Sequence, residues 1–162
     1  AILMRMGIYS DKVHDVKDIP DGAIIAIPND PTNGGRGLML LERAGIIKLK
    51  AGLGMKATPK DIAENPKHVV IKELEAAQLP RGLQDVDAAA ITMNYVMSGG
   101  LDVKKQNIFL ESKDEPLAVM IIAARNKDKD KAEYKDFVKA YQSDSVRKFI
   151  ADKYKGTIEP AF

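Results

Sequence analysis

The sequence predicts an α/β fold with a mostly parallel sheet, and two observations carry this prediction. Apolar runs typical of strands alternate with helical patterns over residues 23–111. The run at 87–93 is rich in alanine, which indicates close packing of helices against a sheet. Two amphipathic helical patterns then end the chain without a strand after them. With 162 residues, the chain can form one ordinary domain or two small lobes.

The first part of the chain contains the clearest helix start. Residues 2–9 and 23–27 are apolar and are predicted as strands. A helix is predicted from about 31 to 44, with Asp30 as its N-cap and Pro31 as its first residue. Gly45 is predicted to end that helix.

The middle of the chain predicts short elements in alternation. Thr58, Pro59 and Asp61 form a helix-start pattern, so a helix is predicted from Thr58 to just before Pro66. The remaining predicted elements are strands at 68–74, 87–93 (ending at Asn94) and 108–110, and a short helix at 79–83.

The last part of the chain predicts one strand and two helices. The wholly apolar run 117–124 is predicted as a strand. Tyr134, Phe137, Val138 and Tyr141 form an amphipathic stripe at helical spacing. Ser143 is predicted to cap a second helix, whose stripe consists of Val146, Phe149, Ile150 and Tyr154. Both stripes are predicted to be core.

Composition excludes several classes of protein. Twenty-five basic and 23 acidic residues leave a net charge of +2, and only 6% of residues are aromatic, so nucleic-acid binding is not predicted. The absence of cysteine excludes disulfides and thiol chemistry. The longest apolar run is too short to span a bilayer. Because the chain starts at Ala1 without an initiator methionine, its start is expected to be processed or truncated.

The sequence predicts no enzyme, no cofactor and no metal site. His14 and His68 are the only histidines, and neither has a companion at metal-ligand spacing, so surface positions are predicted for both. No nucleophile elbow, P-loop or paired-carboxylate motif is present. Gly52 and Gly54 lack the further residues of a nucleotide loop and are predicted to form a turn.

Residues 28–36 (PNDPTNGGR) form the stretch with the clearest binding chemistry. Gly34 and Gly35 in the first helical turn would let a ligand approach the backbone. Arg36 adds a planar donor that matches a carboxylate or a phosphate. This stretch therefore predicts an anion site at a helix start. A capped helix with a surface arginine explains the same residues, and spacing alone does not separate the two interpretations.

Residues 27–36 (IPNDPTNGGR) closely resemble the signature of the methionine-binding lipoproteins of bacterial ABC importers, the NlpA/MetQ family. The resemblance runs along the whole chain in order, so it is more specific than a single motif. Further matching segments are 7–10 (GIYS), 44–50 (AGIIKLK), 64–67 (ENPK), 73–76 (ELEA), 78–81 (QLPR), 140–143 (AYQS) and 160–162 (PAF).

This resemblance implies a two-lobed clamshell of the type II periplasmic-binding-protein kind, with the first lobe incomplete in this chain. Residues 1–17 are then expected to be a hinge strand and a remnant of lobe 1. Residues 18–113 are expected to form lobe 2, the ligand-binding lobe. Residues 114–162 are expected to be the return hinge strand and the C-terminal helices of lobe 1. Roughly the first third of such a protein is expected to be missing.

The resemblance also implies a site. Arg36 matches the arginine that pairs with the ligand carboxylate, and Asn94 matches an asparagine that holds the amino-acid head group. Asn33, one helical turn before Arg36, is a weaker candidate. The residues that shape the side-chain pocket in this family would lie in the absent portion. The chain departs from the family at Val119, where relatives are expected to have asparagine.

The implied function is an extracytoplasmic binding protein that captures methionine and delivers it to the permease subunits of an ABC importer. It would be held at the bacterial cell envelope by an N-terminal lipid anchor absent from this chain. Alternatives left open are binding of a methionine-containing dipeptide or another apolar amino acid, and a ligand-sensing domain of a regulator. Self-association through the incomplete lobe is a further expectation, because that lobe would expose apolar surface.

Overall fold

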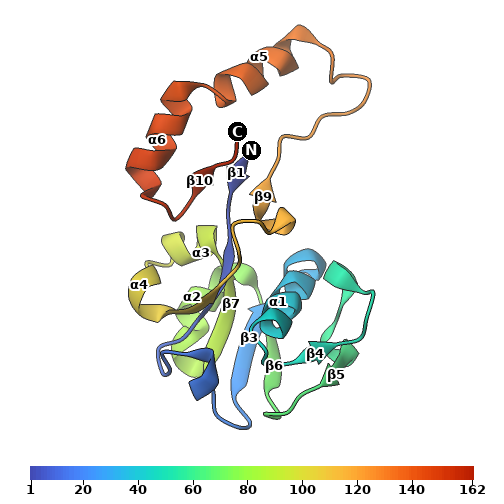
Figure 1. The fold of residues 1–162 in the computed structure, drawn as a ribbon, viewed down its shortest axis with the longest axis vertical. Coiled ribbons are helices and arrows are strands. Elements are labelled where there is room, and N and C mark those ends of the chain that lie inside the picture. Colours follow the sequence, from blue (N-terminus) through green and yellow to red (C-terminus); the bar gives the residue numbers. More distant parts are fainter. The chain divides into compact units, whose positions relative to one another are not determined.

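The structure is a computed structural model that describes residues 1–162, and the chain forms two compact units (Figure 1). The smaller unit consists of Ala1–Arg5 and Lys113–Phe162, and the larger one is Met6–Ser112. Residues 6–17 therefore lie in the larger unit, although the sequence predicts 1–17 as one segment. They do so because Met6–Tyr9 pair with a strand of the larger unit's sheet. The assignment of the units to lobes stays a prediction.

The larger unit is built on a five-stranded sheet in the order β6-β3-β7-β2-β8. Its strands are β2 (Met6–Tyr9), β3 (Ile24–Pro28), β6 (Val70–Leu74), β7 (Ala88–Thr92) and β8 (Asn107–Leu110). The prediction of an α/β fold is confirmed, but the sheet is mixed: β3 runs parallel to β6 and β7, whereas β2 runs antiparallel to β7 and β8.

The reversed direction of β2 determines where the chain enters and leaves this unit. Met6, at the start of β2, pairs with Thr92 at the end of β7. Gly7 pairs with Leu110 at the end of β8. The chain thus enters and leaves at one end of the sheet, which is also the carboxyl end of the parallel strand β7. That end is where open α/β sheets hold ligands.

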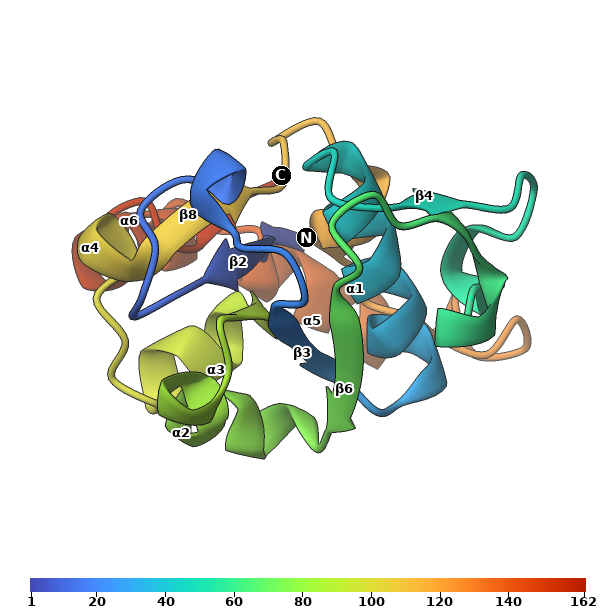
Figure 2. The same cartoon turned by 90° about the horizontal axis from the view of Figure 1, so that it is seen from below.

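Helices cover both faces of this sheet (Figure 2). The long helix α1 (Pro31–Arg43) packs on one face, and α2 (Leu79–Gly82) and α3 (Met93–Ser98) lie on the other, while α4 (Val103–Gln106) precedes β8. Leu38, Leu40 and Leu41 of α1 join strand residues in the main hydrophobic core. A Cβ on Gly37 would lie 3.4 Å from Ile27 and 3.5 Å from Ala90, so α1 packs closely against β3 and β7, as the alanine-rich strand predicts.

The segment after α1 differs from the prediction. In place of a helix starting at Thr58, Pro59–Asp61 form a single 3₁₀ turn, followed by β5 (Ile62–Glu64), which pairs with β4 (Lys48–Leu49). The start signal itself is present, because the Thr58 amide and hydroxyl donate to Asp61 Oδ2 at 3.0 and 2.7 Å. These donors, the hydroxyl first, lower the pKa of Asp61. Strand pairing with β4 ends the helix that this cap would otherwise begin.

The smaller unit has a three-stranded antiparallel sheet and two helices. Its strands are β1 (Ile2–Leu3), β9 (Val119–Met120) and β10 (Glu159–Pro160), in the order β10-β1-β9. The predicted strand 117–124 is wrong beyond these two residues, because residues 116–118 form a 3₁₀ turn and β1 offers only two residues for pairing.

The two predicted C-terminal helices are present as α5 (Ala132–Tyr141) and α6 (Asp144–Tyr154), and the Ser143 hydroxyl accepts the amide of Val146 as predicted. The prediction that both stripes are core is wrong for Phe137 and Phe149, whose exposed fractions are 57% and 55%, although Ile150 is buried. No helix of the structure is both long enough and apolar enough to cross a bilayer.

Candidate functional site

The candidate site begins where β3 passes into α1. The Asp30 carboxylate accepts the backbone N–H of Asn33 at 2.9 Å, and Pro31 occupies the first turn, so the predicted N-cap is confirmed. The Asn33 side chain joins this cap, because its Nδ2 lies 3.1 Å from each carboxylate oxygen of Asp30. This contact occupies part of the hydrogen-bonding capacity of the Asn33 side chain.

The cap gives a testable prediction for stability. Asp30→Ala removes the acceptor of the Asn33 amide and of the Asn33 side chain, so we expect the unfolding free energy to fall by about 1–2 kcal/mol. Urea denaturation followed by circular dichroism would measure this. Thr32→Ala, an exposed substitution in the same turn, is the matched control and should leave the urea midpoint unchanged. Equal midpoints for Asp30→Ala and the parent would contradict the cap.

The two glycines of the first turn serve the protein's own backbone. A Cβ on Gly35 would lie 2.0 Å from the carbonyl oxygen of Met55, and one on Gly34 would lie 2.7 Å from that of Pro28. The sequence predicts that these bare positions admit a ligand. In the structure they admit two backbone carbonyls, because α1 packs tightly against the end of β3 and the segment around Met55. Both glycines also line a cavity, so the expectation of ligand approach stays a prediction.

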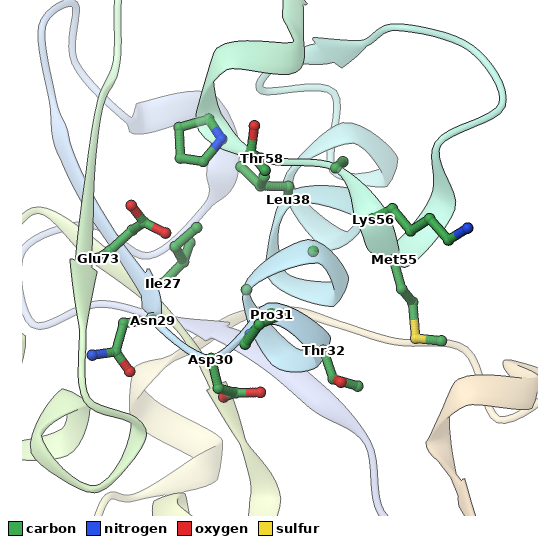
Figure 3. A pocket seen from close by; sticks show the side chains of 14 residues that line it. Ile27, Asn29, Asp30, Pro31, Thr32, Leu38, Met55, Lys56, Thr58 and Glu73 are labelled. Carbon is green, nitrogen blue, oxygen red and sulfur yellow. The ribbon is translucent and has the colours of Figure 1, made fainter.

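A cavity of about 550 Å³ lies beside this helix start (Figure 3). Its walls come from α1, the segment 55–59 and the ends of β3 and β6, and include Ile27, Asp30, Thr32, Met55 and Glu73. None of the three predicted ligand residues lines it. The three predicted ligand residues therefore lie outside this cavity.

Arg36 lies on α1 and is buried, with an exposed fraction of 5%. Its Nε donates to Glu111 Oε1 at 2.8 Å, and its Nη2 donates to Glu111 Oε2 at 2.5 Å. Glu111 is only 2% exposed. This is the two-pronged geometry expected of an arginine that recognises a carboxylate, here with a carboxylate of the same chain. The interpretation of Arg36 as a surface arginine is wrong.

Glu111, the partner of Arg36, is a residue that the sequence pattern does not single out. Its Oε2 also accepts the backbone N–H of Met6 at 2.6 Å. The one signal in the sequence is its position directly after the apolar strand Asn107–Leu110. The charged residues after it, Lys113 to Glu115, give it the pattern of the first residue of a solvated turn.

Asn94 reaches the same end of the sheet from another element. It is the second residue of α3 and its side chain is exposed, so the strand β7 ends at Thr92, before the predicted position. Thr92 pairs with Met6, whose amide donates to Glu111, which in turn holds Arg36. The structure thus places Arg36 and Asn94 near the same end of the sheet, although they are 58 positions apart in the sequence.

The rest of the chain offers no competing metal centre. No group of three or more histidine, aspartate or glutamate side chains in residues 1–162 is arranged to hold a metal ion. His14 and His68 are both exposed.

Comparison with solved structures gives close matches over nearly the whole chain. A nutrient-binding protein from Burkholderia cenocepacia, solved bound to methionine, is 49% identical with a TM-score of 0.92, covering 99% of this chain and 69% of that one. Lipoprotein Tp32 from Treponema pallidum is 35% identical with a TM-score of 0.91, covering 99% and 67% of the two chains.

Sequence comparison leads to the same group of proteins. The D-methionine-binding lipoprotein MetQ of Salmonella typhimurium is 49% identical over 140 residues, which are 85% of this chain and 51% of that protein. Lipoprotein 28 of Escherichia coli is 43% identical and matches all of this chain and 60% of its own length. The chain thus spans about half to three fifths of these curated relatives. The family profile described as NlpA lipoprotein matches residues 1–162. The chain therefore belongs to the NlpA lipoprotein family.

Proposed function

We propose that this protein is the substrate-binding component of a bacterial methionine importer. The observation that carries the proposal is the likeness, over 99% of the chain, to a nutrient-binding protein solved with methionine bound. Curated relatives named as D-methionine-binding lipoproteins support the same ligand. Because the chain spans only part of these relatives, the ligand and the partners are both part of the proposal.

In this proposal Arg36 binds the carboxylate of the amino acid. A guanidinium carries five N–H groups in a planar fork, and burial removes the water that would compete for them. In the same proposal Asn94 contacts the head group from α3, where its side chain is exposed. Asn33 is the weaker candidate, since its Nδ2 already binds Asp30.

The protein would capture its ligand and release it unchanged to the permease subunits of an ABC importer. Relatives of this family are named as binding proteins and lipoproteins, which supports a non-enzymatic role at the cell envelope. Closure around the ligand would supply the affinity, and a change of state on docking to the permease would allow release. A lipid anchor would keep the protein close to that permease.

Isothermal titration calorimetry tests this proposal on protein expressed from its complete gene. We expect methionine to bind with micromolar or tighter affinity and leucine to bind at least about tenfold more weakly, since an apolar pocket separates close analogues by one to two orders of magnitude. Glycyl-methionine is included because a dipeptide is the alternative ligand. Tighter binding of the dipeptide, or no binding of methionine, would overturn the proposal.

Asn94→Ala tests the site within the same experiment. The substitution removes an exposed amide, so the fold should persist while methionine affinity falls about tenfold or more, as for a lost hydrogen bond to a charged group. Ser98→Ala, an exposed substitution four residues later on α3, is the matched control and should leave the affinity unchanged. An unchanged affinity in Asn94→Ala would remove Asn94 from the site.

A further inference from the structure

Arg36 and Glu111 are the only buried charged side chains of the larger unit. The Glu111 carboxylate accepts three N–H groups: Arg36 Nε at 2.8 Å, Arg36 Nη2 at 2.5 Å and the backbone amide of Met6 at 2.6 Å. These three donors, two of them from the one guanidinium, hold the guanidinium in a defined orientation against the carboxylate.

The backbone of Glu111 is fixed as firmly as its side chain. The Glu111 amide donates to the carbonyl of Met6 at 3.0 Å, while the Met6 amide donates to the Glu111 carboxylate. Met6 opens β2, and Glu111 directly follows β8, which pairs with β2. The acceptor that holds Arg36 is therefore attached to the end of the sheet by two hydrogen bonds to Met6.

We propose that Glu111 is the positioning residue of the ligand site, holding the Arg36 guanidinium in the orientation that receives the ligand carboxylate. This inference rests on the proposed function, because it assigns a role in the same site. Glu111 acts through Arg36 and does not itself touch the ligand. An arginine held by a bidentate partner has already lost its rotamer freedom before the ligand arrives, so the ligand does not bear that cost.

The location of Glu111 adds a consequence for the unit as a whole. Met6 is the first residue of the larger unit and Glu111 the last but one. The side chain that orients Arg36 thus also joins the two ends of this unit's chain, 105 positions apart. The orientation of the anchor is thereby tied to the points where the chain enters and leaves the unit.

The test is a cycle that changes both protein and ligand. Protein expressed from its complete gene is titrated with methionine and with methioninamide, which keeps the side chain and the ammonium but lacks the carboxylate. We expect the parent to prefer methionine by about 100-fold, as for a bidentate charged contact. In Glu111→Gln the amide oxygen can accept from one donor group, but its NH₂ faces an N–H, so the arginine is no longer held in its fork.

Glu111→Gln should reduce the preference for methionine over methioninamide about tenfold or more. Only methionine has the carboxylate that binds Arg36, so only its affinity depends on the orientation of the guanidinium. Glu111→Asp keeps the charge but is one methylene shorter, and should give an intermediate preference. Glu42→Gln is the matched control: Glu42 lies on the same helix and also accepts a backbone amide, that of Leu49 at 2.8 Å. Its substitution should leave the preference unchanged.

The outcomes separate the two proposals. If the parent does not bind methionine, the proposed function fails and this inference fails with it. If the parent binds methionine but Glu111→Gln weakens both ligands by the same factor, Glu111 only supports the fold and the inference is overturned. A thermal unfolding curve shows whether Glu111→Gln folds, and if it does not, the preference of Glu111→Asp decides: a parental value overturns the inference and a reduced one supports it.

Discussion

Arg36→Leu and Glu111→Leu should each lower the unfolding free energy of the larger unit by about 3–5 kcal/mol. Each substitution leaves the other charge buried without its partner, at positions that are only 5% and 2% exposed. The double substitution removes both charges, so its loss of unfolding free energy should be smaller than the sum of the two single losses by about 2–3 kcal/mol. A residual loss should remain, because the Met6 amide then has no acceptor from Glu111.

Amide hydrogen exchange of β2 and β7 would measure this in the unit concerned. Lys48 and Glu64 provide the matched control, because they form an ion pair at 2.9 Å whose side chains are 65% and 64% exposed. Lys48→Met should leave the exchange of these strands unchanged, since solvent screens such a pair. Additive effects of Arg36→Leu and Glu111→Leu would show that the two side chains do not depend on each other.

Local sequence signals predict the start of the candidate site well. Asp30 and Pro31 act within four residues of chain, so their preferences are enough to place the beginning of α1. The same kind of signal at Thr58 predicts the cap correctly but the helix wrongly, since the chain after the turn becomes β5 and pairs with β4. A cap signal specifies the start of a turn, while tertiary contacts decide how long a helix continues.

Glu111 could not be predicted in this way because its partners are distant along the chain. Arg36 lies 75 positions away and Met6 lies 105 positions away. The antiparallel direction of β2 brings these three residues together, whereas the alternation of strands and helices predicts a mostly parallel sheet. Because the direction of β2 was predicted wrongly, the sequence did not predict Glu111 as the partner of Arg36. Arg36 itself is the main binding residue that the sequence predicts.

For the glycines of α1, the sequence predicts a close approach but does not identify the backbone that approaches. The sequence predicts that Gly34 and Gly35 permit close approach, and the structure shows such an approach. The approaching group is the protein's own backbone in both cases. A glycine in a helix indicates that another group packs closely against the backbone. Only the fold shows whether that group is a ligand or another part of the chain.

Gly35→Ala should therefore destabilise the larger unit by at least about 2 kcal/mol. In an open helix the same change stabilises by up to about 1 kcal/mol, because alanine is the better helix former. Here the new Cβ would lie 2.0 Å from the Met55 carbonyl oxygen and 2.6 Å from its carbon. These atoms belong to backbone and cannot rotate away, so the segment around Met55 must move, and overpacking of this kind outweighs the gain in helix propensity.

Gly37→Ala on the same helix is the matched control for this prediction. Its Cβ would meet the side chains of Ile27 and Ala90 at 3.4 and 3.5 Å, which is ordinary contact, so we expect a change within about 1 kcal/mol of either sign. Urea denaturation of both variants would measure the difference. Equal stabilities for the two variants would mean that the Met55 segment yields at little cost. In that case Gly35 would not be required for the close packing of this segment on α1, and a ligand would again be the better explanation for a glycine at this position.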